Sequence, residues 1–136
     1  MKFEYFEHTA DVKFRSYGKD LQEAFANAAY ALTNIITDYE KIEKKIEQSF
    51  SIEAEDEKAL LYDFLEQFLI LFDSENFVLK EITEIKIENL KLSVKFTGDN
   101  ELKKYDIHTH VKAITYHEME IIEEQGKVTI QAVPDI

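Results

Sequence analysis

The sequence predicts an α+β domain in two layers, with two helices packed on one face of a mostly antiparallel (mixed) sheet. Two segments place apolar residues at helical spacing, and each is long enough to cover a sheet. The segments around them alternate apolar and polar residues, as strands do. The resulting order is β-β-α-β-α-β-β-β-β. The 136 residues hold only three glycines and one proline, with no repeat or linker, so we expect one domain over residues 1–136.

The first half of the chain contains two strands and a helix. Residues 3–7 and 10–17 are predicted strands, because apolar residues such as Phe14 lie between charged neighbours. The turn YGKD follows, where Asp20 and Glu23 match the capping box of a helix start. Apolar residues then recur at helical spacing at Leu21, Ala24, Phe25, Ala28, Ala29, Leu32 and Ile36.

The second half contains the richest apolar stripe in the chain. A helix that begins near Asp56 carries it, and a sheet needs such cover, so we expect this stripe in the core. A tight turn is expected at Glu88-Asn89, and Gly126 in EEQGK can adopt the positive φ of a hairpin turn. Strands are expected at residues 45–54, 77–88, 90–97, 109–122 and 127–133.

Charge and composition exclude several classes of protein. The absence of cysteine excludes disulfides, a cysteine nucleophile and thiolate zinc sites. Sixteen basic and twenty-eight acidic residues leave a net charge of −12, and Arg15 is the only arginine, so strong direct nucleic-acid binding is not expected. The acidity fits a basic protein partner, a divalent cation or solubility alone. No signal-peptide core or membrane-length apolar run is present, so we expect a soluble, cytoplasmic protein.

The histidines and catalytic motifs offer little chemistry. There is no glycine-rich phosphate loop, no G-x-S-x-G and no H-E-x-x-H. His108 and His110 would face the same side of a strand and could bind zinc or copper if further ligands lay nearby. Alternatively, they are solvated or hydrogen-bonded side chains at a junction between loop and strand.

Two acids are better candidates for a site. Asp11 interrupts a strand-like segment, and Asp135 precedes Ile136, whose own carboxylate is a third negative group. If these groups gathered, they would repel one another unless a cation held them. Such hard oxygen ligands suit Ca²⁺ or Mg²⁺. The alternative is that Asp11 caps a turn and Asp135 belongs to a frayed tail.

Several motifs, in order over nearly the whole chain, resemble the archease family. HTAD, KAITYH and the final DI are specific in combination, although each alone would be weak. One departure is Lys13, where archaeal members often carry glycine. The matching segments are EHTADV (7–12), YGKDLQEAFANAAYAL (17–32), ALLYDFLEQFLILFD (59–73), VKAITYHEM (111–119) and VPDI (133–136).

The resemblance implies an accessory protein and not an enzyme. Archeases act as cofactors of the GTP-dependent tRNA-splicing RNA ligase, promote guanylylation of the ligase histidine and allow multiple turnover. A chaperone-like role toward a tRNA cytosine-5 methyltransferase is also associated with the family. A third reading from the residues alone is a metal-dependent hydrolase that uses Asp11, His8 and the pair at 108 and 110, but no general acid–base pairing supports it.

The resemblance also implies a site. The divalent-cation site of the family, usually occupied by calcium, with magnesium or manganese as alternatives, maps onto the side chains of Asp11 and Asp135 and a main-chain or terminal oxygen of Ile136. His8, Lys112 and His117 are candidate partner contacts. The VKAITYH segment is interpreted either as a core strand or as a docking surface.

Overall fold

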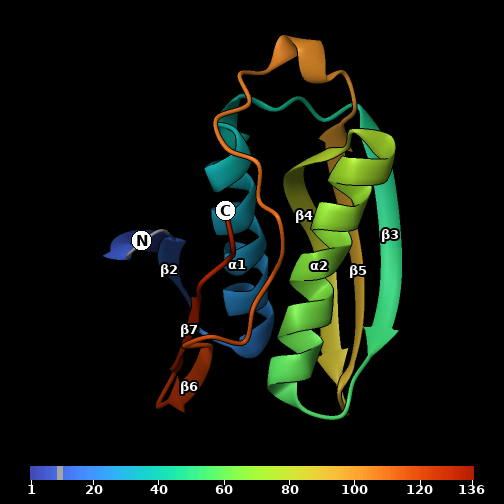
Figure 1. Ribbon diagram of the computed structural model, residues 1–136. Helices are drawn as coiled ribbons and strands as arrows, with labels where there is room; N and C mark the ends of the chain where they lie inside the picture. Colours follow the sequence, from blue (N-terminus) through green and yellow to red (C-terminus); the bar gives the residue numbers. More distant parts are fainter. Residues whose placement is uncertain (9–10) are drawn as a thin grey trace.

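The computed structural model contains two long helices and seven strands among the residues it describes, 1–8 and 11–136 (Figure 1). The predicted α+β class and element order are confirmed. The helices are α1 (Leu21–Ile36) and α2 (Glu57–Glu75). The strands are β1 (Phe3–His8), β2 (Asp11–Gly18), β3 (Ile46–Glu53), β4 (Val78–Glu88), β5 (Lys91–Asp99), β6 (Glu120–Glu124) and β7 (Lys127–Ala132), and short 3-10 helices lie at η1 (Tyr39–Lys41) and η2 (Leu102–Lys104).

The strands form two antiparallel sheets, whereas the sequence pattern predicts one. One sheet has the order β1-β2-β7-β6, and the other has the order β3-β5-β4. The separation follows from pairing across the chain: the N-terminal hairpin takes the last strand, β7, as its neighbour, whereas the three middle strands pair among themselves. Helix α1 lies between the sheets, against β2 and β7 on one side and β4 on the other.

The cap predicted at Asp20 is confirmed, and α2 begins after a similar cap at Asp56. The Asp20 side chain accepts a hydrogen bond from the Glu23 amide at 2.8 Å, and Glu23 accepts one from the Lys19 amide at 2.9 Å. The Asp56 side chain accepts from the Ala59 amide at 2.8 Å. These bonds satisfy amide groups that have no partner within the helix.

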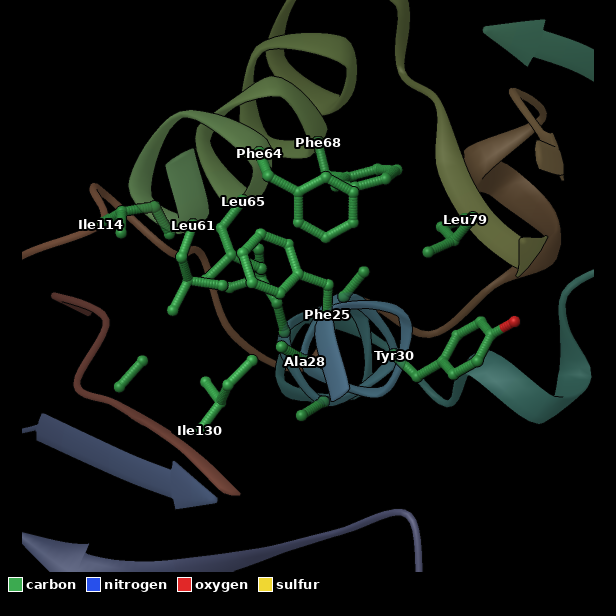
Figure 2. Packing of buried hydrophobic residues seen from close by; sticks show 14 of the residues in the cluster. Phe25, Ala28, Tyr30, Leu61, Phe64, Leu65, Phe68, Leu79, Ile114 and Ile130 are labelled. Atoms are coloured by element: carbon green, nitrogen blue, oxygen red, sulfur yellow. The ribbon is translucent and has the colours of Figure 1, made fainter. Parts of the chain in front are cut away.

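The core lies where the two helices meet the sheets (Figure 2). Phe64 of α2 is fully buried, and its ring centroid lies 5.4 Å from that of Phe25 of α1 and 5.1 Å from that of Phe68. Ile130 of β7 and Leu79 of β4 reach the same core from the two sheets. The α2 stripe is therefore core, as predicted.

The predicted strand at 109–122 is wrong over most of its length. Only Glu120–Glu124 forms a strand, and the connection over residues 105–119 is irregular apart from one bridge between Ala113 and Asp135. Its buried residues Val111, Ile114 and Met119 lie three and five positions apart, which does not match the period of a strand. In Figure 1 this connection, drawn in orange, runs down between α1 and α2 to β6.

No helix in the described part of the chain is long and apolar enough to cross a membrane.

Candidate functional site

The chain end is fixed against the irregular connection by backbone hydrogen bonds. The Lys112 amide donates to the Asp135 carbonyl at 2.8 Å, and the Asp135 amide donates to the Ala113 carbonyl at 2.9 Å. The Thr115 hydroxyl donates to the Val133 carbonyl at 2.7 Å. Val133 is buried, and the terminal Ile136 side chain packs against the core. The alternative of a frayed tail is therefore wrong.

Asp11 is the first residue of β2, and the C-terminal residues 133–136 extend past the same end of the sheet. It pairs with His8 of β1, and the register of β2 with β7 runs up to Phe14 opposite Ala132. Asp11 precedes Phe14 by three residues and Asp135 follows Ala132 by three residues, so both lie beyond the same end of this ladder. Phe14 is fully buried, so alternation along β2 directs Asp11 to the opposite face, away from α1. Thr9, Ala10 and the His8 side chain lie outside the described part of the structure.

The oxygen donors at this end fit a hard divalent cation in type. Asp11 is half-buried and Asp135 is exposed. Both supply carboxylate oxygens beyond the same end of the β2–β7 ladder, and Ile136 adds the terminal carboxylate. Calcium and magnesium prefer such ligands. Among the described residues, however, no three histidine, aspartate or glutamate side chains gather as a ligand group. A cation held by Asp11, Asp135 and Ile136 therefore stays a prediction.

Lys112 and His117 project from the connection that holds the tail. Lys112 is exposed, while its backbone amide is bonded to Asp135. The His117 side chain is 63% exposed, and its Nε2 lies 3.2 Å from Oε2 of Glu118. The connection thus buries Val111, Ile114 and Met119 and exposes the two predicted partner contacts, so it contributes to both core and surface.

A contact that no sequence pattern predicts links this connection to β2. Lys13 Nζ lies 3.5 Å from Glu118 Oε1, and the Gln131 side chain donates to the Glu118 carbonyl at 2.9 Å. Glu118 has a positive φ of 53°, which is uncommon for a residue other than glycine. No motif signals this contact, because Lys13 and Glu118 are 105 positions apart.

The His108 and His110 pair does not form the predicted strand geometry. Both residues are exposed in the irregular connection, and the His108 amide donates to the Ile36 carbonyl at the end of α1 at 2.7 Å. His108 Nε2 lies 3.8 Å from a carboxylate oxygen of Asp106. The pair therefore matches the alternative of solvated or hydrogen-bonded side chains.

Comparison with known proteins identifies the family. Residues 3–136 match the model of the Archease protein family (MTH1598/TM1083). Protein archease of Pyrococcus abyssi is 41% identical over 141 residues and that of Pyrococcus furiosus 42% identical, with 99% of each chain covered in both cases.

Solved structures agree with the fold. The solution structure of protein 1598 of Methanobacterium thermoautotrophicum matches with a TM-score of 0.85 and 33% identity, covering 99% of both chains. The crystal structure of an archease, described as a possible chaperone, from Thermotoga maritima matches with a TM-score of 0.64 and 20% identity, covering 96% of this chain and 94% of that one, which supports the fold alone. The family match over residues 3–136 and the identity to these relatives place this chain in the archease family.

Proposed function

We propose that this chain is an accessory activator of the GTP-dependent tRNA-splicing RNA ligase, and that it promotes guanylylation of the ligase and its multiple turnover in the cytoplasm. Membership of the archease family supports this role. The acidic chain with its single arginine, Arg15, is suited to contact a protein more than to grip tRNA. The chain itself acts as a non-enzyme in this proposal.

The observation that carries the proposal is the pairing of residues 133–136 with residues 111–115. This pairing holds the backbone of Asp135, next to the chain end, against the backbone of Lys112 and Ala113. Asp11 begins β2 beyond the same end of the β2–β7 ladder. Charged groups that are held in place in this way lose little conformational entropy when a partner binds them.

In this proposal a divalent cation, Ca²⁺ or alternatively Mg²⁺ or Mn²⁺, is held by Asp11, Asp135 and the terminal oxygen of Ile136. When bound, the cation supplies positive charge that can neutralise phosphate oxygens. The chain's own residues keep the oxygen donors in place: the backbone bonds to Ala113 fix Asp135, and the β1–β2 register fixes Asp11. Three protein groups do not fill the shell of about six to eight oxygens that calcium takes, so water or partner groups complete it.

The experiment compares ligase guanylylation with GTP in the presence of the wild-type chain and of its variants. Asp11→Asn and Asp135→Asn remove the charged ligands but little apolar burial, so each variant should melt normally and lose most of its stimulation of the ligase. Glu47→Gln on β3 is the matched control, because it removes one exposed carboxylate far along the chain from the site. Titration with Ca²⁺ by calorimetry gives a second readout. The heat of Ca²⁺ binding should disappear in both site variants and should be unchanged in the control.

Full stimulation by an Asp11→Asn chain that melts normally would contradict the assigned site. Failure of the wild-type chain to stimulate the ligase would contradict the proposed function itself.

A chaperone-like adaptor of a tRNA cytosine-5 methyltransferase is the second candidate. The description of the Thermotoga maritima archease as a possible chaperone favours it. Light scattering of the methyltransferase with and without this chain tests it, because an adaptor should suppress aggregation even without the ligase. Equal aggregation in both samples would remove this candidate.

A further inference from the structure

The net negative charge of the chain is concentrated in two segments. Residues 53–76 contain eight acidic residues and one lysine, and residues 118–124 contain four acidic residues and no basic one. Together they account for eleven of the twelve net negative charges of the chain. Helix α2 and strand β6, which carry most of these acids, are neighbours in the fold. The acidity is therefore concentrated around α2 and β6 and is not spread evenly along the chain.

The carboxylates around α2 and β6 have fewer lysine partners than those of the three-stranded sheet and the loops beside it. In and beside that sheet, Glu43, Glu81 and Glu84 each form ion pairs with lysines. These hydrogen bonds and charges hold the pKa values of the three carboxyl groups below the usual range. On the α2–β6 face, the described residues provide no such ion pair for Asp63 or Glu66. Asp63 and Glu66 are thus available to cations from outside the chain.

A stacked pair of aromatic rings, one half-buried and one exposed, lies among these acids. Tyr62 of α2 and Tyr116 of the connection stack with their centroids 4.5 Å apart and their planes 18° apart. Tyr116 is 54% exposed although it is a large side chain. Burial of its hydroxyl and the nearby charges of Asp63, Asp56 and Glu66 raise the pKa of Tyr116. Asp63 follows Tyr62 directly in the sequence, and Glu66 lies one helical turn further along α2, so both carboxylates lie near the stacked rings.

The face extends along α2 and across to β6. Glu66 and Ile70 follow Tyr62 at four-residue spacing, so all three lie on one side of the helix, and Ile70 is 46% exposed. In the first turn, partial burial and the negative charge of the neighbouring Glu123 of β6 raise the pKa of Glu57. Two carboxylates in contact repel each other when both are ionised, and a cationic group nearby relieves that repulsion.

We propose that this face, formed by α2 and β6 around the Tyr62–Tyr116 stack, is a docking surface for an arginine-containing basic segment of a partner protein. A guanidinium group stacks on an aromatic ring and pairs with carboxylates at the same time, which matches Tyr116 beside Asp63 and Glu66. A hydrated divalent cation would make no use of the exposed ring or of Ile70. A nucleic acid has the same sign of charge as the face and is repelled. The surface is distinct from the chain-end groups of the proposed function and extends that function by locating a second contact.

The test uses a synthetic peptide of alternating arginine and glycine, with a glutamine–glycine peptide as the neutral control. Affinity is measured by calorimetry at low salt, and binding is mapped by amide shifts in NMR spectra of the full chain. The arginine peptide should bind with shifts centred on α2, β6 and residue 116, and the neutral peptide should not bind. Asp63→Asn combined with Glu66→Gln should weaken binding about tenfold, because two close charges are lost.

Two comparisons separate a specific surface from general attraction. The matched control is Glu47→Gln combined with Glu88→Gln, which makes the same charge change on the three-stranded sheet and should weaken binding less than about twofold. Tyr116→Ala should weaken binding several-fold, whereas Tyr116→Phe keeps the stacking ring and should bind as the wild type does.

Equal weakening by the two double variants, or shifts centred elsewhere, would overturn the proposal. Self-association of the free chain that the Asp63 and Glu66 changes abolish would also overturn it, because the occupant would then be a second copy. The peptide experiment contains no ligase, so its failure leaves the proposed activation untouched. Asp11→Asn should bind the peptide normally, which keeps the two sites distinguishable.

Discussion

Helix α2 and the connection over residues 105–119 both supply side chains to the same core, but their backbones are held in different ways. The helix satisfies its own amides and is capped by Asp56 at its start and by Asn76, with a φ of 59°, at its end. In the connection, the amides of His108 and Lys112 bond to α1 and to the chain end. The connection therefore depends on a small number of long-range bonds, and these same bonds position the candidate site.

The largest expected effect is on the packing of the helix. Phe64→Ala should lower the free energy of unfolding by about 3–5 kcal/mol, because it opens a cavity among aromatic rings. Urea denaturation followed by circular dichroism measures this change. Exposed Asp73→Ala on the same helix is the control and should change stability by less than about 0.5 kcal/mol. A loss below about 1 kcal/mol for Phe64→Ala would mean that α2 contributes no more than the connection.

A smaller effect is expected at Asp99, where the connection leaves β5. Asp99 is 1% exposed, and it accepts hydrogen bonds from the Tyr105 hydroxyl at 2.6 Å and from the Asn100 amide at 2.8 Å. Burial alone would raise the pKa of Asp99, but the hydrogen bonds from Tyr105 and the backbone, together with the Lys104 charge, lower it below the usual range. Asp99→Asn should therefore cost about 2 kcal/mol at neutral pH, since hydrogen bonds to a charged group are lost.

The pH dependence of Asp99→Asn follows from the same shift. A carboxyl whose folded pKa is lowered stabilises the protein above its unfolded pKa of about 3.9, and this contribution is lost as the pH falls through the folded value. The difference in unfolding free energy between wild type and Asp99→Asn should accordingly shrink between pH 5 and pH 2. A difference that stays constant over this range would show that the charge of Asp99 does not hold the connection.

The contrast between the two regions explains what the sequence could predict. Helix α2 carries apolar residues at a regular period and a cap at Asp56, so both its bounds and its buried face follow from local rules. The connection has buried residues at irregular spacing, and its backbone partners lie elsewhere in the chain, at Ile36 and Asp135. The spacing of apolar residues predicts a strand at residues 109–122, because the local sequence does not reveal which distant groups accept the backbone hydrogen bonds of this segment.

The candidate site divides in the same way. The motifs that resemble the archease family point to Asp11, Asp135 and Lys112 as site residues. The structure adds the backbone pairing between Lys112 and Asp135. The Tyr62–Tyr116 stack joins two segments 54 positions apart, and no local sequence pattern predicts it. Contacts between distant segments require the fold itself.

A further prediction concerns the bond that ties the connection to the tail. The Thr115 hydroxyl donates to the Val133 carbonyl and accepts from the His117 amide at 3.2 Å. Thr115→Val keeps the shape but loses both bonds, so it should cost about 1 kcal/mol. Thr83→Val is the matched control, because its hydroxyl bond to Lys95 is exposed to water and should contribute less. Equal losses in thermal melts of the two variants would contradict a special role for Thr115.

The smallest effect on stability is expected at Asp135, although its effect on activity should be large. The backbone of Asp135 makes the bonds to Lys112 and Ala113, and its side chain is exposed. Asp135→Asn keeps those backbone bonds, so we expect a change in stability below about 0.5 kcal/mol in the absence of divalent cations. Removing one of several nearby negative charges can even stabilise the metal-free protein slightly.

Melting curves of wild type and Asp135→Asn with a chelator, and again with Ca²⁺, measure both situations. The wild type should gain stability from Ca²⁺ and the variant should not. If Asp135→Asn instead melts as early as Thr115→Val, the side chain itself holds the tail, and its loss of ligase stimulation would reflect unfolding of the chain end and not the loss of a ligand.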